Sequence, residues 1–179
     1  MISLVWCYVE FLMIYTFAIC VYYTHISTMR THHYRLQVSW TGNTGSGTFD
    51  YRSYERSHQV QAPGKPVIQG SSDPDFRGDA SAYNPEELLL SALSACHMLW
   101  FLRLAADAGV VVTAYSDEPE GLMEEDGRTG RFTEVILHPK LELAEAYAAE
   151  LLNQLHAQAK AACFIANSVN FPVRCEPYH

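Results

Sequence analysis

A long apolar segment near the middle of the chain, residues 84–109, limits the folds that this chain can adopt more than any other feature. Its sequence is NPEELLLSALSACHMLWFLRLAADAG. Asn84 suits a helix N-cap, Pro85 suits the first turn, and Gly109 suits the position just after a helix. The pattern predicts one helix of roughly 36 Å by the standard rise. Two serines and one histidine are the only polar residues in its middle, so we expect it to be buried on most sides.

Composition places the chain among soluble single-domain proteins. It has 179 residues, 49% of them hydrophobic, and a net charge of −8. The length and apolar content allow one domain with a real core. The acidic balance argues against nucleic acid as a partner. Five cysteines without a CxxC pair exclude a disulfide scaffold and a zinc ribbon, and they are typical of a reducing compartment such as the cytoplasm.

The first 28 residues differ in composition from the rest. Residues 1–28 are almost wholly apolar, are long enough to span a bilayer, and lack the basic start of a signal peptide. Two interpretations stay open. Either residues 2–26 insert in a membrane as an N-terminal anchor, or the native protein starts at Met29 or carries an unstructured extension. Residues 29–179 are expected to form the folded domain in both cases.

The other elements alternate between strands and helices. We expect strands at 34–40 and 48–54 joined by a glycine-rich turn, short strands near Val60 and at 67–68, and later strands at 110–115, 132–143 and 171–175. The acidic segment 116–130 is expected to be a turn-rich connector. A second helix is expected over 144–162. This order predicts an α+β fold in which antiparallel sheets surround two long helices, and a homodimer that buries the first helix from both sides.

Two cysteines carry the candidate chemistry. Cys96 lies in the middle of the long helix, and Cys163 lies at the end of the second helix in another turn of small residues. Buried structural thiols are the ordinary alternative for both. If the helices pack together, Cys96 can act as an attacking thiol and Cys163 as a resolving thiol. A reactive thiolate in apolar surroundings needs a cation, for which Arg77 is the leading candidate and Arg52 the reserve.

Two further side chains are candidate partners of Cys96. Glu86 can orient an arginine, but it lies ten residues before Cys96, roughly 15 Å along the same helix, so only a second subunit can bring it to that thiol. His97 points about 100° away from Cys96, which makes a Cys–His pair unfavourable. A hydrolase that uses Cys96 with His156 or His138 stays open, and no metal-ligand spacing was recognised.

The chain from Tyr34 to Cys175 resembles the OsmC/Ohr family of thiol peroxidases, in its OsmC-like branch. NPEELLLSALSAC at Cys96 and AKAACF at Cys163 carry the resemblance, and WTGNTGSGT and FRGDASAYNPEE support it. The first hairpin turn lacks the arginine of the Ohr branch. The resemblance implies an intertwined homodimer with active sites at the interface, in which Glu86 and an arginine set the thiolate.

The resemblance also implies an activity. Cys96 is then peroxidatic and Cys163 resolving, the substrate is an organic hydroperoxide, and the reductant is an external dithiol such as a dihydrolipoyl group. No bound cofactor or metal is expected. The alternative function is a non-catalytic dimeric protein on the same fold that senses redox state or binds a small ligand.

Overall fold

The computed structural model describes residues 29–178, which fall into two units divided after Arg35. Residues 29–35 form no helix or strand. The second unit, from Leu36 on, holds every helix and strand of the described chain. The prediction for residues 1–28 lies outside the described residues.

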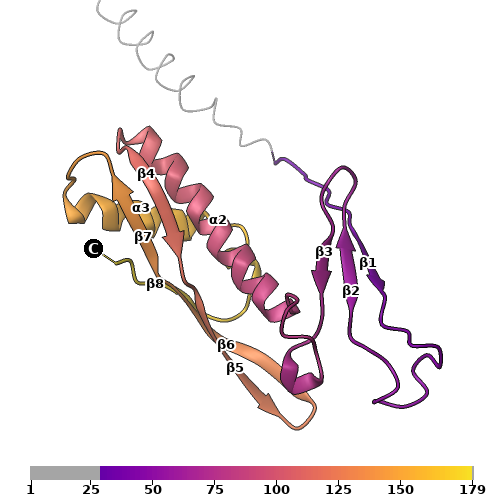
Figure 1. Cartoon of the computed structure of the whole chain (residues 1–179). Coiled ribbons are helices and arrows are strands. Elements are labelled where there is room, and N and C mark those ends of the chain that lie inside the picture. Colours follow the sequence, from indigo (N-terminus) through magenta and orange to yellow (C-terminus); the bar gives the residue numbers. More distant parts are fainter. Residues whose placement is uncertain (1–28, 179) are drawn as a thin grey trace, which may run out of the picture. The chain divides into compact units, whose positions relative to one another are not determined.

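The first strands form a small antiparallel sheet in the order β1 (Gln37–Trp40), β2 (His58–Gln61) and β3 (Ile68–Gly70) (Figure 1). The strand predicted at 48–54 is wrong, because these residues lie in turns. The side chain of Asn43 accepts hydrogen bonds from the backbone N–H groups of Gly45 and Gly47, at 2.8 and 3.0 Å. These bonds stabilise a wide loop where the sequence suggested a tight turn.

The long helix α2 (Pro85–Asp107) is close to its predicted range. The Asn84 side chain accepts a hydrogen bond from the N–H of Glu87, and the Glu87 carboxylate accepts one from the N–H of Asn84. This reciprocal capping box satisfies two donors that a helix start leaves unpaired. At the other end, Gly109 has a φ of +74°, the left-handed conformation that glycine adopts without strain.

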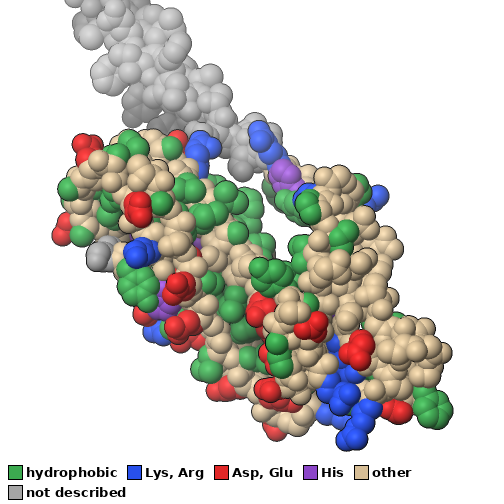
Figure 2. Space-filling model, in the orientation of Figure 1, with side chains coloured by type: hydrophobic (Ala, Val, Ile, Leu, Met, Phe, Trp, Pro, Cys, Tyr) green, Lys and Arg blue, Asp and Glu red, His purple; other side chains and the backbone are tan. Residues whose placement is uncertain are grey.

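Burial of α2 is less complete than the sequence suggested. Its fully buried side chains form one stripe, made of Leu93, His97, Phe101 and Ala105. The side chain of Leu99, on another face, is 63% exposed. Figure 2 shows hydrophobic side chains gathered at the surface over the helix-bearing part of the chain. By length and composition alone α2 could cross a membrane, a test that core helices of soluble proteins also pass. The predicted burial on most sides is therefore not reached within one chain.

Two further sheets pack with the helices. One pairs β4 (Val112–Asp117) with β7 (Pro139–Leu143), and the other has the order β5 (Glu120–Asp126), β6 (Thr129–Leu137), β8 (Val173–Cys175). The segment predicted as a connector instead contains the strand β5, the end of β4 and the start of β6. The single predicted strand over 132–143 is two strands, β6 and β7, that separate at His138. The α+β class is confirmed, although β8 pairs with β6 in parallel rather than antiparallel.

The second helix, α3 (Ala149–Ala162), begins five residues later than predicted and ends as predicted. Short 3-10 turns, η1 (Pro74–Phe76) and η2 (Ala166–Ser168), precede α2 and follow α3. The helices meet in a core cluster whose fully buried members are Phe101, Ala105, Val110, Leu152, Leu155 and Ala159. A second cluster joins the first half of α2 to β6 and β8 through Leu93, Val135, Leu137 and Val173.

Candidate functional site

Cys96 and Cys163 meet where α2 packs against α3. Cys163 is the residue that ends α3, and its side chain is 1% exposed, whereas Cys96 is half-buried. Burial raises the pKa of the Cys163 thiol to about 11, and a hydrogen bond to Cys96 together with the charge of a Cys96 thiolate adds to the rise. Both cysteines are free thiols. The two thiols therefore lie near enough to each other, where the helices pack, for one to shift the pKa of the other.

The local helical geometry explains why the two thiols lie near each other. Cys96 lies at the border of the buried stripe of α2, about 60° around the axis from Leu93 by the helical repeat. Cys163 is the C-cap of α3, and its sulfur accepts a 3.4 Å hydrogen bond from the N–H of Ala166. The ring of Trp100, one turn after Cys96, meets the ring of Phe164 edge to face at 5.6 Å. Aromatic side chains thus flank the thiol pair on the sides of both helices.

The other predicted site residues lie away from this pair. Arg77 is exposed at the end of η1 in a left-handed conformation, with a φ of 64°. Glu86 is half-buried in the first turn of α2, and the continuous helix keeps it far from Cys96 of the same chain. Within residues 29–178, neither side chain forms an ion pair. Their predicted roles stay predictions, and the same holds for Arg52, which is exposed in the first loop.

Arg56 is an arginine that sequence analysis did not single out. Its guanidinium carbon lies 4.2 Å from the ring centre of Tyr51 and 4.3 Å from that of Tyr54. It also donates hydrogen bonds to the backbone carbonyls of both tyrosines. This cation is held on aromatic faces in the first loop, and its spacing to the tyrosines, two and five residues, was the available signal.

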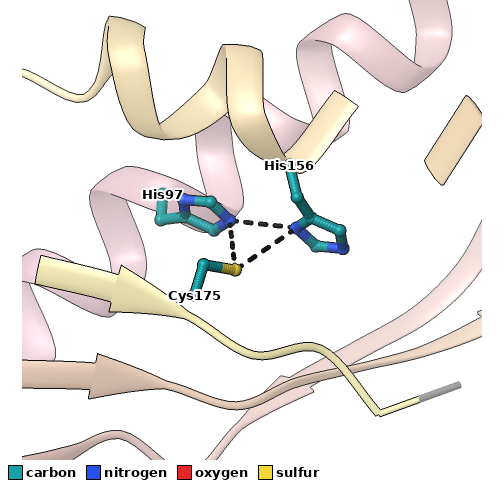
Figure 3. Close-up of side chains that lie close together, drawn as sticks. All are labelled: His97, His156 and Cys175. Carbon is teal, nitrogen blue, oxygen red and sulfur yellow. Dashed lines mark hydrogen bonds between the residues drawn. The ribbon is translucent and has the colours of Figure 1, made fainter. Parts of the chain in front are cut away.

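A second group of side chains lies on the neighbouring face of α2. His97, next to Cys96, points into the core together with His156 of α3 and Cys175 at the end of β8 (Figure 3). Nε2 of His97 lies 3.0 Å from Nδ1 of His156, and the Cys175 sulfur lies 3.5 and 3.7 Å from these two nitrogens. His97 and His156 are 1% and 3% exposed. The spacing of these three residues along the sequence did not predict that they lie together.

Charges around this group come from different elements. Burial lowers the pKa of His97, the charge of Asp117 opposes that shift, and Lys160 adds to it. Burial also raises the pKa of Cys175 to about 12, with a further rise from Asp117 and a fall from Lys160. Both groups are therefore neutral near pH 7. Asp117 lies at the end of β4, where it accepts a hydrogen bond from Ser94 of α2.

One cavity along α2 lies on a different face from the thiols. It has a volume of about 440 Å³ and is lined by residues that include Glu87, Ser91, Ser94, Met98 and Asp117. Cys96 points to the opposite side of the helix, about 180° from Glu87 by the helical repeat. Leu93, on the buried stripe of α2, is fully buried in the core.

Comparison with known proteins identifies the family. A family model described as OsmC-like protein matches residues 78–177, more than half of the chain. The chain belongs to the OsmC-like family. Residues 78–177 include both helices, the thiol pair and the His97–His156–Cys175 group. The resemblance seen in the sequence is thereby confirmed.

Relatives of the chain within this family differ in what their names state. The uncharacterized protein YmaD of Bacillus subtilis is 21% identical over 145 residues, which cover 79% of this chain and 89% of YmaD. An OsmC-like protein of unknown function from Vibrio cholerae is 29% identical with a TM-score of 0.75, covering 83% of this chain and all of that one.

A third relative has a functional name. An organic hydroperoxide resistance protein OsmC from Legionella pneumophila is 18% identical with a TM-score of 0.62, and the match covers 83% of this chain and 100% of that chain. At this identity the likeness shows the shared fold alone. For this OsmC-like chain, the activity that the relative's name suggests is therefore only a proposal.

Proposed function

We propose that this OsmC-like protein is a thiol peroxidase that reduces organic hydroperoxides to alcohols. The observation that carries the proposal is the proximity of Cys96 on α2 to the buried Cys163 at the end of α3, two free thiols that influence each other's ionisation. Family membership supports it, as does the existence of relatives named organic hydroperoxide resistance proteins.

The proposed cycle begins at Cys96. Its thiolate attacks the terminal oxygen of the hydroperoxide, the O–O bond breaks, and the alkoxide takes up a proton and leaves as the alcohol. Cys96 is now a sulfenic acid, two electrons more oxidised than the thiol. The Cys163 sulfur then attacks the Cys96 sulfur, water leaves, and a disulfide forms. An external dithiol reduces that disulfide by exchange and restores both thiols.

The assignment of roles follows from the difference between the two thiols. With a pKa raised to about 11, Cys163 keeps its proton at neutral pH, so it is unsuited to the first attack. It is also almost fully buried, whereas Cys96 is half-buried. A peroxide that reaches the helix pair from solvent therefore meets Cys96 first. Because Cys163 lies near Cys96, it can act on the oxidised thiol after a local movement of the side chains.

The proposal includes a homodimer. Within residues 29–178 no arginine donates a hydrogen bond to Cys96, and a thiolate in such surroundings needs a cation. The apolar face of α2 that contains Leu99 is also left exposed in the single chain. A second copy packed on that face buries it and can bring Glu86 and an arginine, with Arg77 as the leading candidate, to the thiol.

The test measures peroxide consumption by the purified full-length chain. With tert-butyl hydroperoxide and dihydrolipoamide we expect turnover, and Cys96→Ser should abolish it. Cys163→Ser should stall after one oxidation and accumulate a sulfenic acid that dimedone traps. Ala106→Ser, an exposed change on the same helix, is the matched control and should leave turnover unchanged. Full activity of Cys96→Ser would overturn the proposal.

A second function is favoured by one observation, the absence of a guanidinium at Cys96 within the described chain. In that case the protein senses redox state or binds a small ligand and does not turn over peroxide. It predicts slow alkylation of Cys96 near pH 7 and a disulfide only under strong oxidant. The alkylation rate of Cys96, compared with that of a free thiol in solution, distinguishes the two functions.

A further inference from the structure

The second cluster, His97, His156 and Cys175, has no part in the peroxidase cycle. Three elements far apart in the sequence supply it: the middle of α2, the middle of α3 and the end of β8 (Figure 3). Each residue directs one atom with a lone pair toward the same point, and these three atoms lie within 4.8 Å of one another. Convergence of this kind on a buried point is the arrangement of a metal centre.

The separations between these atoms match the geometry of tetrahedral zinc. Zinc binds imidazole nitrogen at about 2.0–2.1 Å and thiolate sulfur at about 2.3 Å, so a tetrahedral angle sets ligand separations of about 3.3 Å between two nitrogens and about 3.6 Å between nitrogen and sulfur. The two nitrogens here are 3.0 Å apart. The nitrogen–sulfur distances are 3.5 and 3.7 Å. A shift of a few tenths of an ångström would accommodate the ion.

The type of donor also selects the ion. Two imidazoles and a thiolate suit zinc and other late first-row transition ions, whereas magnesium and calcium require oxygen ligands. The histidines would bind as neutral imidazoles and Cys175 as a thiolate. The ring of Phe101 stacks on that of His156 with a centroid separation of 4.1 Å, which fixes the orientation of that ligand.

A cavity gives access to the cluster from outside. A cavity of about 390 Å³ reaches His156 and Cys175, and its lining includes Asn153, Lys160 and Glu176. Asp117 adds a negative charge near His97 and Cys175, which favours a cation, and Lys160 adds a positive charge that opposes it. Three protein ligands with one open position are typical of zinc sites that bind an exchangeable water or small ligand.

We propose that His97, His156 and Cys175 bind one zinc ion, through Nε2, Nδ1 and Sγ, with the fourth position open to the cavity beside α3. The site is separate from the Cys96–Cys163 pair in its ligands, although His97 follows Cys96 directly. It does not depend on the proposed peroxidase activity. The sequence-based expectation that the protein has no metal is replaced by this proposal.

The test is metal binding by the purified, reduced full-length chain after treatment with a chelator. Zinc should bind at one equivalent per chain in competition with a chromophoric chelator. Cobalt(II) should give the near-ultraviolet charge-transfer absorption of a thiolate-bound ion and the intense visible bands of a four-coordinate one. Cys175→Ser should lose the charge-transfer band. His156→Gln should weaken zinc binding by more than about 100-fold, since loss of mere outer-shell partners already costs 10–100-fold.

Controls exclude the other thiols and folding defects. The double variant Cys96→Ser/Cys163→Ser should keep one equivalent of zinc and the full cobalt spectrum, and His138→Gln should do the same. Circular dichroism checks that Cys175→Ser and His156→Gln keep the native helix content. The proposal is overturned if the double variant loses the metal while Cys175→Ser keeps it, or if the wild-type protein binds less than one equivalent at micromolar zinc.

Discussion

Ser94 on α2 donates a 2.5 Å hydrogen bond to Oδ2 of Asp117 at the end of β4. The other carboxylate oxygen of Asp117, Oδ1, accepts a 2.6 Å hydrogen bond from the backbone N–H of His138, between β6 and β7. One side chain therefore joins the long helix to both sheets that pack with it. It also places a negative charge beside the His97–His156–Cys175 group.

Replacing Asp117 should lower the stability of the fold. In Asp117→Ala the hydroxyl of Ser94 and the N–H of His138 lose their acceptor, and we expect the free energy of unfolding to fall by about 1–3 kcal/mol. Urea denaturation followed by circular dichroism measures the change. Asp107→Ala removes an exposed carboxylate that pairs with Arg103 at 2.9 Å, and it should cost less than about 0.5 kcal/mol. Equal losses in both variants would contradict the linking role of Asp117.

The capping box at Asn84 should contribute measurably to α2. Asn84→Ala removes the 2.8 Å hydrogen bond to the N–H of Glu87 and should destabilise the protein by about 1 kcal/mol. Ser91→Ala, an exposed change one turn into the same helix, is the control and should alter stability by less than about 0.5 kcal/mol. Thermal unfolding of the two variants side by side checks the difference. If Asn84→Ala proved as stable as Ser91→Ala, the capping box would make no measurable contribution to stability.

The thiols should differ in reactivity in a pH-dependent way. Cys163 has a pKa raised from 9.0 to about 11, so at pH 8 its thiolate fraction is about 100-fold smaller than that of an ordinary thiol. We expect iodoacetamide to label Cys96 well before Cys163, and labelling of Cys163 to accelerate as the pH rises toward 11. Peptide mass spectrometry after timed quenching measures both rates. Equal rates at pH 8 would show that the buried thiol is not protonated as described.

The exposed apolar face of α2 should be an interface between two copies of the chain. Leu99→Glu places a charge at a leucine that is 63% exposed in the single chain, and it should convert a dimer into a monomer. Sedimentation velocity across a range of protein concentrations measures the assembly. Val111→Glu introduces the same charge at a valine that is 54% exposed outside the helix, and it should remain dimeric. A wild-type protein that sediments as a monomer at all concentrations would remove the basis of this prediction.

The elements that sequence predicted best are those whose signals are local. Helix α2 begins and ends within two residues of its predicted range because its cap, first-turn proline and terminal glycine act on adjacent backbone groups. The strand β5 was missed because its side chains are all exposed, so it has no alternation of apolar and polar residues. Its stability comes from backbone hydrogen bonds with β6, and these bonds require no particular pattern of side chains.

The candidate sites show the same contrast. The proximity of Cys96 to Cys163 could be anticipated, because each thiol lies in a helical turn of small residues that allows close packing, whereas their roles stay predictions. The grouping of His97 with His156 and Cys175 could not be anticipated, since 59 and 19 residues separate its members. Only the packing of α2 on α3 and the parallel pairing of β8 bring them together.

The parallel strand β8 has a consequence for how the interior of the protein opens. Only three residues pair with β6, and the tail continues with two backbone hydrogen bonds, from Glu176 to Leu137 and from Tyr178 to Pro139. Segments with so few bonds detach at lower free energy than a packed helix. Local fraying of this tail would uncover Cys175 while the α2–α3 core stays folded. Detachment of β8 then sets the rate at which solutes reach Cys175. Amide hydrogen exchange along residues 173–178 measures how often this segment opens.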